Sequence, residues 1–330
     1  MIIKNSNLRR ELFSNRYLIL AIMAAIIFLF LLINTLNNMT KQKDNNLITP
    51  EQSITGQSNT TSKQEIYTPE KTTISGSNVN EKKQEENKTI IDNFINYCNQ
   101  KQIEQAYNLL TDDCKKEVFF SNIENFNNNY VNKVFNGKKT YSMQSWVNRD
   151  TYTTYKVKIV DDMISTGKIT SKNNEIEDYY TVVQDGGNYK LNINNYIAKK
   201  EINKEKEFQG IKITIISRDT YKDYEIYDVK VENLNQNSIL LDSQESTDSM
   251  YVMASNDSKY RAYSYEIDKS RLIIEPGRSR TITIKFNKRY SNEAITRRIV
   301  FSDIIKNYDE YRTLQNKKEY KDRWTISIDV

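Results

Sequence analysis

The chain has 330 residues, enough for about two domains plus a non-globular part, and its formal net charge of +5 is spread along the sequence. It contains no histidine, which excludes Ser-His-Asp and Cys-His nucleophile systems and every His-containing zinc site. Its eight glycines form neither GxGxxG nor GxxxxGKS/T, and no basic block marks a nucleic-acid arm, so the common phosphate loops and a nucleic-acid partner are not expected.

The first patterned segment is apolar. Residues 17–33 carry no charged side chain, and extending them to Leu36 gives a stretch that spans roughly 30 Å as a helix, enough to cross a bilayer core. Residues 1–16 hold four basic residues and one acidic residue. The positive-inside bias predicts a cytoplasmic tail over 1–16, one transmembrane helix over 17–36 and an extracytoplasmic remainder. No small-x-small cleavage site follows, which favours an uncleaved signal anchor over a signal peptide.

Residues 37–87 are rich in Asn, Thr, Ser, Gln, Lys and Glu, and their few apolar residues follow no period. Such a stretch buries too little apolar surface to offset its conformational entropy. We therefore expect a disordered linker over 37–87.

The pattern of residues 88–204 changes midway. Apolar residues recur at helical spacing from Ile90 to Val118, and strand-like alternation begins after Gly137. The expected strands cover residues 141–147, 153–160, 178–183 and 189–193, with a hairpin turn at 185–188. Helices followed by an antiparallel meander predict an α+β domain.

Two stretches of this part, AYNLLTDD (106–113) and VVQDGGNYKLNINNYI (182–197), resemble the nuclear transport factor two-like fold. More narrowly, the chain looks like extracytoplasmic copies of that fold tethered by one membrane helix in low-GC Gram-positive bacteria. These include TcaA-type proteins and subunits of conjugation and type IV secretion machines. The resemblance implies a cone-shaped domain with a cavity between helices and sheet. Residues 1–16 lack the zinc-ribbon cysteines of the TcaA type.

Four aromatic residues are candidates to line that cavity: Trp146, Tyr155, Tyr179 and Tyr180. Aromatic residues on alternating strands equally suit a packed core, so both roles stay open. The nearby acidic residues lie at expected strand ends, where solvated turns are typical. We expect no catalytic, cofactor-binding or metal-binding residue.

The two cysteines, Cys98 and Cys114, lie on the apolar faces of adjacent expected helices. In an oxidising compartment they are candidates for a disulfide, which would stabilise by about 3 kcal/mol in the chain-entropy model. The alternative is a pair of buried free thiols that act as small apolar side chains.

Residues 205–330 contain eight short alternating runs separated by Asn, Asp and Ser turns, which predicts an all-β antiparallel sandwich. The progression from VKVENLNQNSILL (229–241) to IIEPGRSRTITIKF (273–286) is similar to immunoglobulin-like sandwich domains of bacterial surface proteins. The resemblance implies location and binding rather than chemistry.

Five basic residues of this part could form a basic patch suited to an anionic wall polymer or to lipid headgroups: Arg278, Arg280, Lys285, Arg297 and Arg298. The patch requires that the residues converge in space. The alternative is ordinary solvated strand faces whose basic residues protect sheet edges.

The sequence therefore predicts a non-enzymatic, single-pass membrane protein of the bacterial cell envelope with two extracytoplasmic binding folds. It would bind or assemble with protein partners, for example in a secretion or conjugation apparatus. An alternative is an envelope-stress sensor or regulator that binds a wall or lipid ligand in the α+β cavity. A third class, a carboxylate-based glycosidase, would need two carboxyl groups about 5–9.5 Å apart in a cleft.

Overall fold

The computed structural model describes residues 81–162 and 175–330, except residues 186 and 292. All of these residues belong to one compact unit, 64–330. The predicted tail (1–16), the predicted span (17–36) and most of the predicted linker lie outside the described residues. None of the helices described is long and apolar enough to cross a membrane. The prediction of a single-pass membrane anchor is therefore not supported.

The first described element is helix α3 (Glu81–Asn99), which begins inside the predicted linker. Lys82 and Glu86 form an i,i+4 pair on it, and the buried Asn87 side chain donates a 2.9 Å hydrogen bond to the Tyr155 hydroxyl. Residues 81–87 are therefore helical rather than linker, because Asn87 is tied to the sheet that α3 covers.

Short helices follow α3. They are α4 (Ile103–Asn108), α5 (Asp112–Phe119), α6 (Ile123–Phe126), the π-helical turn η1 (Asn127–Val131) and α7 (Asn132–Val134). Side-chain caps start two of them: Thr111 accepts from the Cys114 amide, and Asn122 accepts from the Glu124 and Asn125 amides. These capping residues divide the apolar periodicity into short pieces.

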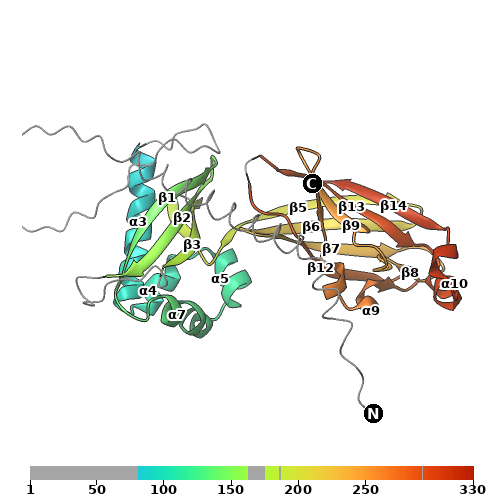
Figure 1. Cartoon of the computed structure of the whole chain (residues 1–330), viewed down its shortest axis with the longest axis horizontal. Coiled ribbons are helices and arrows are strands. Elements are labelled where there is room, and N and C mark those ends of the chain that lie inside the picture. The colour runs from blue at the N-terminus through green and yellow to red at the C-terminus, as the bar shows by residue number, and fades with distance from the viewer. Residues whose placement is uncertain (1–80, 163–174, 186, 292) are drawn as a thin grey trace, which may run out of the picture. The chain divides into compact units, whose positions relative to one another are not determined.

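The helices cover an antiparallel four-stranded sheet with the order β1-β2-β3-β4 (Figure 1). Its strands are β1 (Lys139–Asn148), β2 (Tyr152–Asp161), β3 (Ile176–Asp185) and β4 (Asn188–Asn192). The β3–β4 pairing places Asp185 opposite Asn188, so the predicted hairpin turn is confirmed. Helices and sheet share one apolar core, in which Phe94 of α3 packs edge-on against Tyr180.

A second antiparallel sheet has the order β12-β7-β6-β5. Its strands are β5 (Tyr196–Phe208), β6 (Ile211–Tyr221), β7 (Glu225–Asn233) and β12 (Ser279–Phe286). Strand β5 runs across the predicted boundary at 204/205 and links the two sheets. It follows a turn at Asn194 and Asn195, whose φ angles are both positive and whose amides donate to the buried Asp178 carboxylate.

A third sheet packs against the second and completes the sandwich. It contains β8 (Ile239–Leu240), β9 (Met250–Ala254), β10 (Lys259–Arg261), β11 (Ile273–Ile274), β13 (Thr296–Ile305) and β14 (Arg323–Asp329). Short helical turns connect these strands: η3 (Ser264–Glu266), α9 (Lys269–Leu272), α10 (Tyr308–Thr313) and η4 (Lys317–Glu319). Both sheets contribute to one core, which includes Ile213, Val229, Ile284, Phe301 and Ile326.

The predicted fold class is wrong as it was stated. Strands make up 45% of the described residues and helices are few, so this part of the chain is mainly β-sheet rather than the predicted combination of a transmembrane helix, an α+β domain and a sandwich. The sequence pattern missed β5 because its second half, from Glu201, is almost entirely polar and exposed. Backbone pairing with β6, rather than apolar alternation, holds this strand in place.

Candidate functional site

The four candidate cavity residues lie on opposite faces of the first sheet. Tyr155 and Tyr180 face the helices and are buried in the core, where the Tyr180 hydroxyl is 2.6 Å from that of Tyr130. Tyr179 and Trp146 lie on the other face and pack edge-to-face at 5.1 Å. The structure therefore brings these residues together as two pairs, because consecutive residues of a strand point to opposite faces.

Cys98 and Cys114 are both buried and both free in the structure, so the predicted disulfide is not formed. Burial raises the pKa of the Cys114 thiol to about 12, and burial also raises the pKa of Cys98. A thiol with so high a pKa stays protonated and unreactive at neutral pH. The structure thus agrees with the alternative of two small apolar core residues.

The five residues of the predicted basic patch do not share one surface. Arg280 and Lys285 belong to β12, but Arg280 has the strand parity of the buried Ile282 and Ile284, whereas Lys285 has the opposite parity. Arg280 donates a hydrogen bond to the Ser270 carbonyl, and the Lys285 ammonium lies 4.4 Å from the Tyr224 ring centroid. Arg278 precedes β12, while Arg297 and Arg298 belong to β13 of the other sheet. Strands of different sheets thus separate the five residues.

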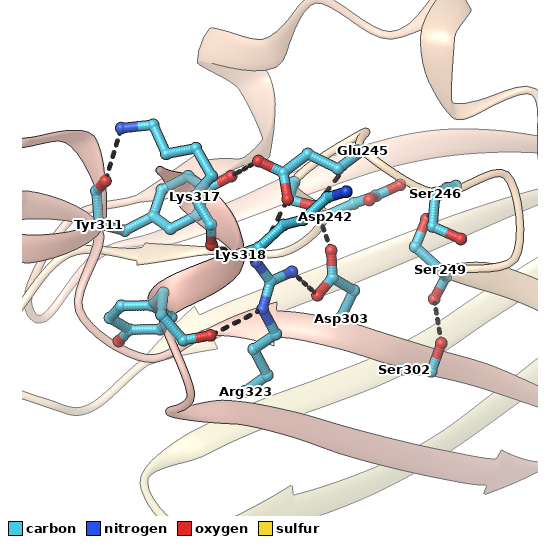
Figure 2. Close-up of polar contacts among 12 residues, drawn as sticks. Asp242, Glu245, Ser246, Ser249, Ser302, Asp303, Tyr311, Lys317, Lys318 and Arg323 are labelled. Atoms are coloured by element: carbon cyan, nitrogen blue, oxygen red, sulfur yellow. Dashed lines mark hydrogen bonds and ion pairs between the residues drawn. The ribbon is translucent and has the colours of Figure 1, made fainter. Parts of the chain in front are cut away.

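One polar cluster of the sandwich is organised by Arg323, the first residue of β14; we call it the Arg323 network (Figure 2). The guanidinium donates to Asp303 and, at 3.2 Å, to Glu245. The Tyr311 hydroxyl also donates to Glu245, and the Ser243 hydroxyl donates to Asp303. The network borders a shallow depression of about 610 Å³.

Two carboxyl groups beside a depression are what a glycosidase would require, but the Arg323 network does not supply its general acid. Burial raises the pKa of Glu245, yet hydrogen bonds from Tyr311 and Arg323 bring it below the ordinary value. A general acid needs a raised pKa. Burial does raise the pKa of Asp242, but this residue is fully buried and does not line the depression. The hydrogen bonds from Arg323 to Glu245 and to Asp303 of β13 instead hold the loop that carries Glu245 against the third sheet.

A different cavity, of about 360 Å³, lies beside the first half of β5 and the end of β6; we call it the cation pocket. Its wall comes from the β1–β2 turn, the start of α5, strands β5 and β6, and the segment between β12 and β13. The Tyr290 hydroxyl donates a 3.0 Å hydrogen bond to Tyr152 across it. Five cationic and two anionic side chains line the pocket: Arg149, Lys199, Lys200, Arg218, Lys288, Asp113 and Glu225.

Two of these cations are already neutralised by carboxylates. Lys288 and Glu225 are each only 2% exposed and form a 2.9 Å ion pair. The other Glu225 oxygen accepts hydrogen bonds of 2.8 Å from both Tyr227 and Thr296, so this buried carboxylate is fully satisfied. Lys199 lies 3.3 Å from Glu117. The buried pair of Lys288 and Glu225 forms the floor of the pocket. The hydrogen bonds from Tyr227 and Thr296 complete this pair, as a buried ion pair requires.

Two cations of the pocket, Lys200 and Arg149, have no ion pair among the described residues, and Arg218 has one long ion pair. Lys200 of β5 and Arg218 of β6 are direct cross-strand partners, although like charges in that position destabilise a sheet. The Nε of Arg218 is buried without a hydrogen-bond partner, and its nearest carboxylate, Glu225, is 4.0 Å away. Partial burial, together with the neighbouring cations Arg218 and Lys204, lowers the pKa of Lys200. Arg149 is not isolated either, because it interacts with the Tyr290 side chain.

The cation pocket was not predicted from the sequence. Its residues come from segments as far apart as Thr111 and Thr296, and no short motif contains them. One signal was present: a strand that carries consecutive lysines, Lys199 and Lys200, pairs with a strand that carries Arg218. The signal could not be used, because β5 itself was not predicted.

Comparisons with known proteins do not show a family. No protein-family model matches the chain, and no curated protein matches it. One similar solved structure is a conserved hypothetical protein from Bacillus anthracis, with a TM-score of 0.22 and 12% identity over 27% of this chain and 81% of that one. Another is the yjhA protein from Bacillus subtilis, with a TM-score of 0.28 and 14% identity over 39% of this chain and 97% of that one. Likenesses of this size carry no argument about fold or function.

Proposed function

We propose that this protein is a non-catalytic binding protein whose cation pocket takes a small anionic ligand. The observation that carries the proposal is the cross-strand pair of Lys200 and Arg218, in which Arg218 makes one long ion pair, 4.0 Å to Glu225, and Lys200 makes none among the described residues. Like charges directly opposite each other destabilise a sheet, and an anion bound beside both would relieve their repulsion. A ligand oxygen that accepts from the Arg218 Nε would also satisfy this buried donor.

The shape and the surroundings of the pocket support the same function. A volume of about 360 Å³ falls within the range of small-molecule sites, roughly 300–1,000 Å³. The buried pair of Lys288 and Glu225 gives the site a preformed floor. Arginine and lysine side chains that line a concave site attract and hold phosphate or carboxylate groups.

Catalysis is not part of this proposal, because the charged residues of the pocket suit binding. Its carboxylate Glu225 is saturated by three hydrogen-bond donors and cannot act as a base without losing one of them. Assembly with protein partners and a role as an envelope sensor or regulator remain predictions. If the protein is a regulator, the cation pocket is a better ligand site than the interior of the first sheet, where Tyr155 and Tyr180 are packed core.

The test is isothermal titration calorimetry of the full chain with inorganic phosphate at constant ionic strength. We expect saturable binding with one site per chain, and an affinity at least tenfold weaker for Arg218→Met and for Lys200→Met. The matched control is Lys230→Met, because Lys230 lies on β7 outside the pocket and pairs with Glu232 at 3.1 Å. The control should bind phosphate as the wild type does.

Two results would contradict the proposal. One is the absence of saturable phosphate binding to the wild type, and the other is equal weakening by all three substitutions, which would indicate a general charge effect. Thermal unfolding of each variant checks that it is folded before its affinity is interpreted.

A further inference from the structure

We propose that the ligand of the cation pocket is a monosaccharide or polyol that bears the anionic group as a phosphate or a carboxylate. This inference rests on the proposed function and names the class of its ligand. It starts from the residues of the pocket wall other than Arg149, Lys200 and Arg218.

Hydroxyl groups surround the cations. Thr151 follows Arg149 by two residues, Thr220 follows Arg218 by two residues on the same face of β6, and all four line the pocket. Hydroxyl side chains both donate and accept hydrogen bonds, as sugar hydroxyls do. An inorganic anion has fewer O–H groups than a sugar, so it would make fewer hydrogen bonds to these hydroxyl side chains.

A carboxylate of the pocket wall, Asp113, also favours a sugar or polyol that carries an anionic group. Asp113, in the first turn of α5, lines the pocket, and burial together with the carboxylates Glu117 and Glu201 raises its pKa, although Lys199 lowers it. A ligand that is anionic throughout would be repelled by Asp113. A ligand with an anionic end and O–H groups at the other end can place the first against Lys200 and Arg218 and donate from the second to Asp113.

The pocket wall gives little support to a flat aromatic ligand. Its described lining contains two aromatic rings, Tyr152 and Tyr290, and their hydroxyls are hydrogen-bonded to each other at 3.0 Å. Burial and the neighbouring Tyr152 raise the pKa of the Tyr290 hydroxyl. Nucleobase sites normally stack the base on an aromatic face. Small apolar side chains, Val183, Ala198 and Ile295, complete the lining and suit the C–H face of a sugar ring.

The experiment compares five probes by calorimetry with the full chain: inorganic phosphate, glucose 6-phosphate, glucuronate, glucose and adenosine monophosphate. We expect at least one of the two sugar acids to bind tenfold or more tightly than inorganic phosphate. Glucose should bind too weakly to detect, and adenosine monophosphate should bind no more tightly than inorganic phosphate. The two sugar acids distinguish phosphate from carboxylate as the anionic group.

Variants of Asp113 and Thr220, which are expected to bind the sugar hydroxyls, test the sugar class separately from the anionic group. Asp113→Asn and Thr220→Val should reduce the affinity for the sugar acid about tenfold. Asp113→Asn should at the same time bind inorganic phosphate at least as tightly as the wild type, because a repelling charge is removed, whereas Arg218→Met should reduce both affinities. Asp113 is exposed whereas Thr220 is buried, so Asp113→Asn should fold even if Thr220→Val perturbs β6.

The outcomes separate the two proposals. If no anion binds, the proposed function fails together with this inference. If inorganic phosphate binds at the cation pocket but neither sugar acid binds more tightly, only the sugar class is overturned. It is also overturned if adenosine monophosphate binds most tightly, or if Asp113→Asn and Thr220→Val bind the sugar acid as the wild type does.

Discussion

At the scale of single residues, the charged side chains of this protein differ in whether the fold neutralises them. Lys288 is 2% exposed and fully paired with Glu225, and Arg323 satisfies two carboxylates at once. Lys200 and Arg218 face each other, and of the two only Arg218 has an ion pair among the described residues, a long one of 4.0 Å to Glu225. This contrast is the basis of the proposal that the second pair serves a ligand.

Removing the charge of Arg323 should destabilise the protein. In Arg323→Met, Glu245 and Asp303 lose their shared donor, and Asp303 is only 11% exposed, so we expect a loss of about 1–3 kcal/mol in the free energy of unfolding. Urea unfolding of the full chain measures it. Arg312→Met is the matched control, since Arg312 and Asp309 form an exposed i,i+3 pair and the expected loss is below about 0.5 kcal/mol. Equal losses in both variants would contradict the role assigned to Arg323.

The two cysteines should be hidden thiols rather than a disulfide. A thiol reagent should modify neither Cys98 nor Cys114 in the native protein, because both side chains are inaccessible. The same reagent should modify both after unfolding without a reductant. Failure to modify the unfolded, unreduced protein would show a bridge and contradict the structure.

At the scale of elements, helix α5 is tied to the β5–β6 ribbon through a small group of charged and phenolic side chains. The Tyr196 hydroxyl donates a 2.8 Å hydrogen bond to Asp219 of β6, and Lys199 of β5 reaches both Asp219, at 3.9 Å, and Glu117 of α5. This group borders the cation pocket, so the geometry of the pocket depends on it.

Asp219, which lies in this contact between α5 and the β5–β6 ribbon, should make the free energy of unfolding depend on pH. Burial raises its pKa to about 6, although the hydrogen bond from Tyr196 and the charge of Lys199 lower it. The native state therefore holds the proton more tightly than the unfolded state, and this group's contribution to stability falls as the pH rises from about 4 to about 6.

The variant Asp219→Asn removes this titration. The free energy of unfolding of the variant minus that of the wild type should increase by about 1–3 kcal/mol between pH 4 and pH 7. Urea unfolding of both proteins at several pH values measures this difference. Because the other titrating groups are the same in both proteins, their contributions cancel. A difference that is flat or decreases over this range would show that the pKa of Asp219 is not raised.

At the scale of the whole molecule, local alternation in the sequence predicted most strands but not how they are assembled. Runs such as Thr153–Val160 and Arg280–Phe286 bury alternate residues, and each is a strand in the structure. Strand β5 was missed because its outer half is charged and is held by backbone pairing. The five basic residues are near one another in sequence but are divided between β12, the turn before it and β13 of the other sheet, a separation that depends on the assembly of the strands. The cation pocket depends on contacts between distant segments, which no local pattern contains.

The central claim is that the protein keeps Lys200 opposite Arg218 at a cost to its own stability because an anion binds between them. The most direct test is the free energy of unfolding of Lys200→Met relative to wild type, measured on the full chain without phosphate and with saturating phosphate at matched ionic strength. Without phosphate, the variant should be more stable by about 0.2–1 kcal/mol, because a like-charge cross-strand pair is removed.

With saturating phosphate the order should reverse, because only the wild type gains the full free energy of ligand binding. A variant that is less stable than the wild type without phosphate, or that gains as much stability from phosphate as the wild type does, would contradict the claim.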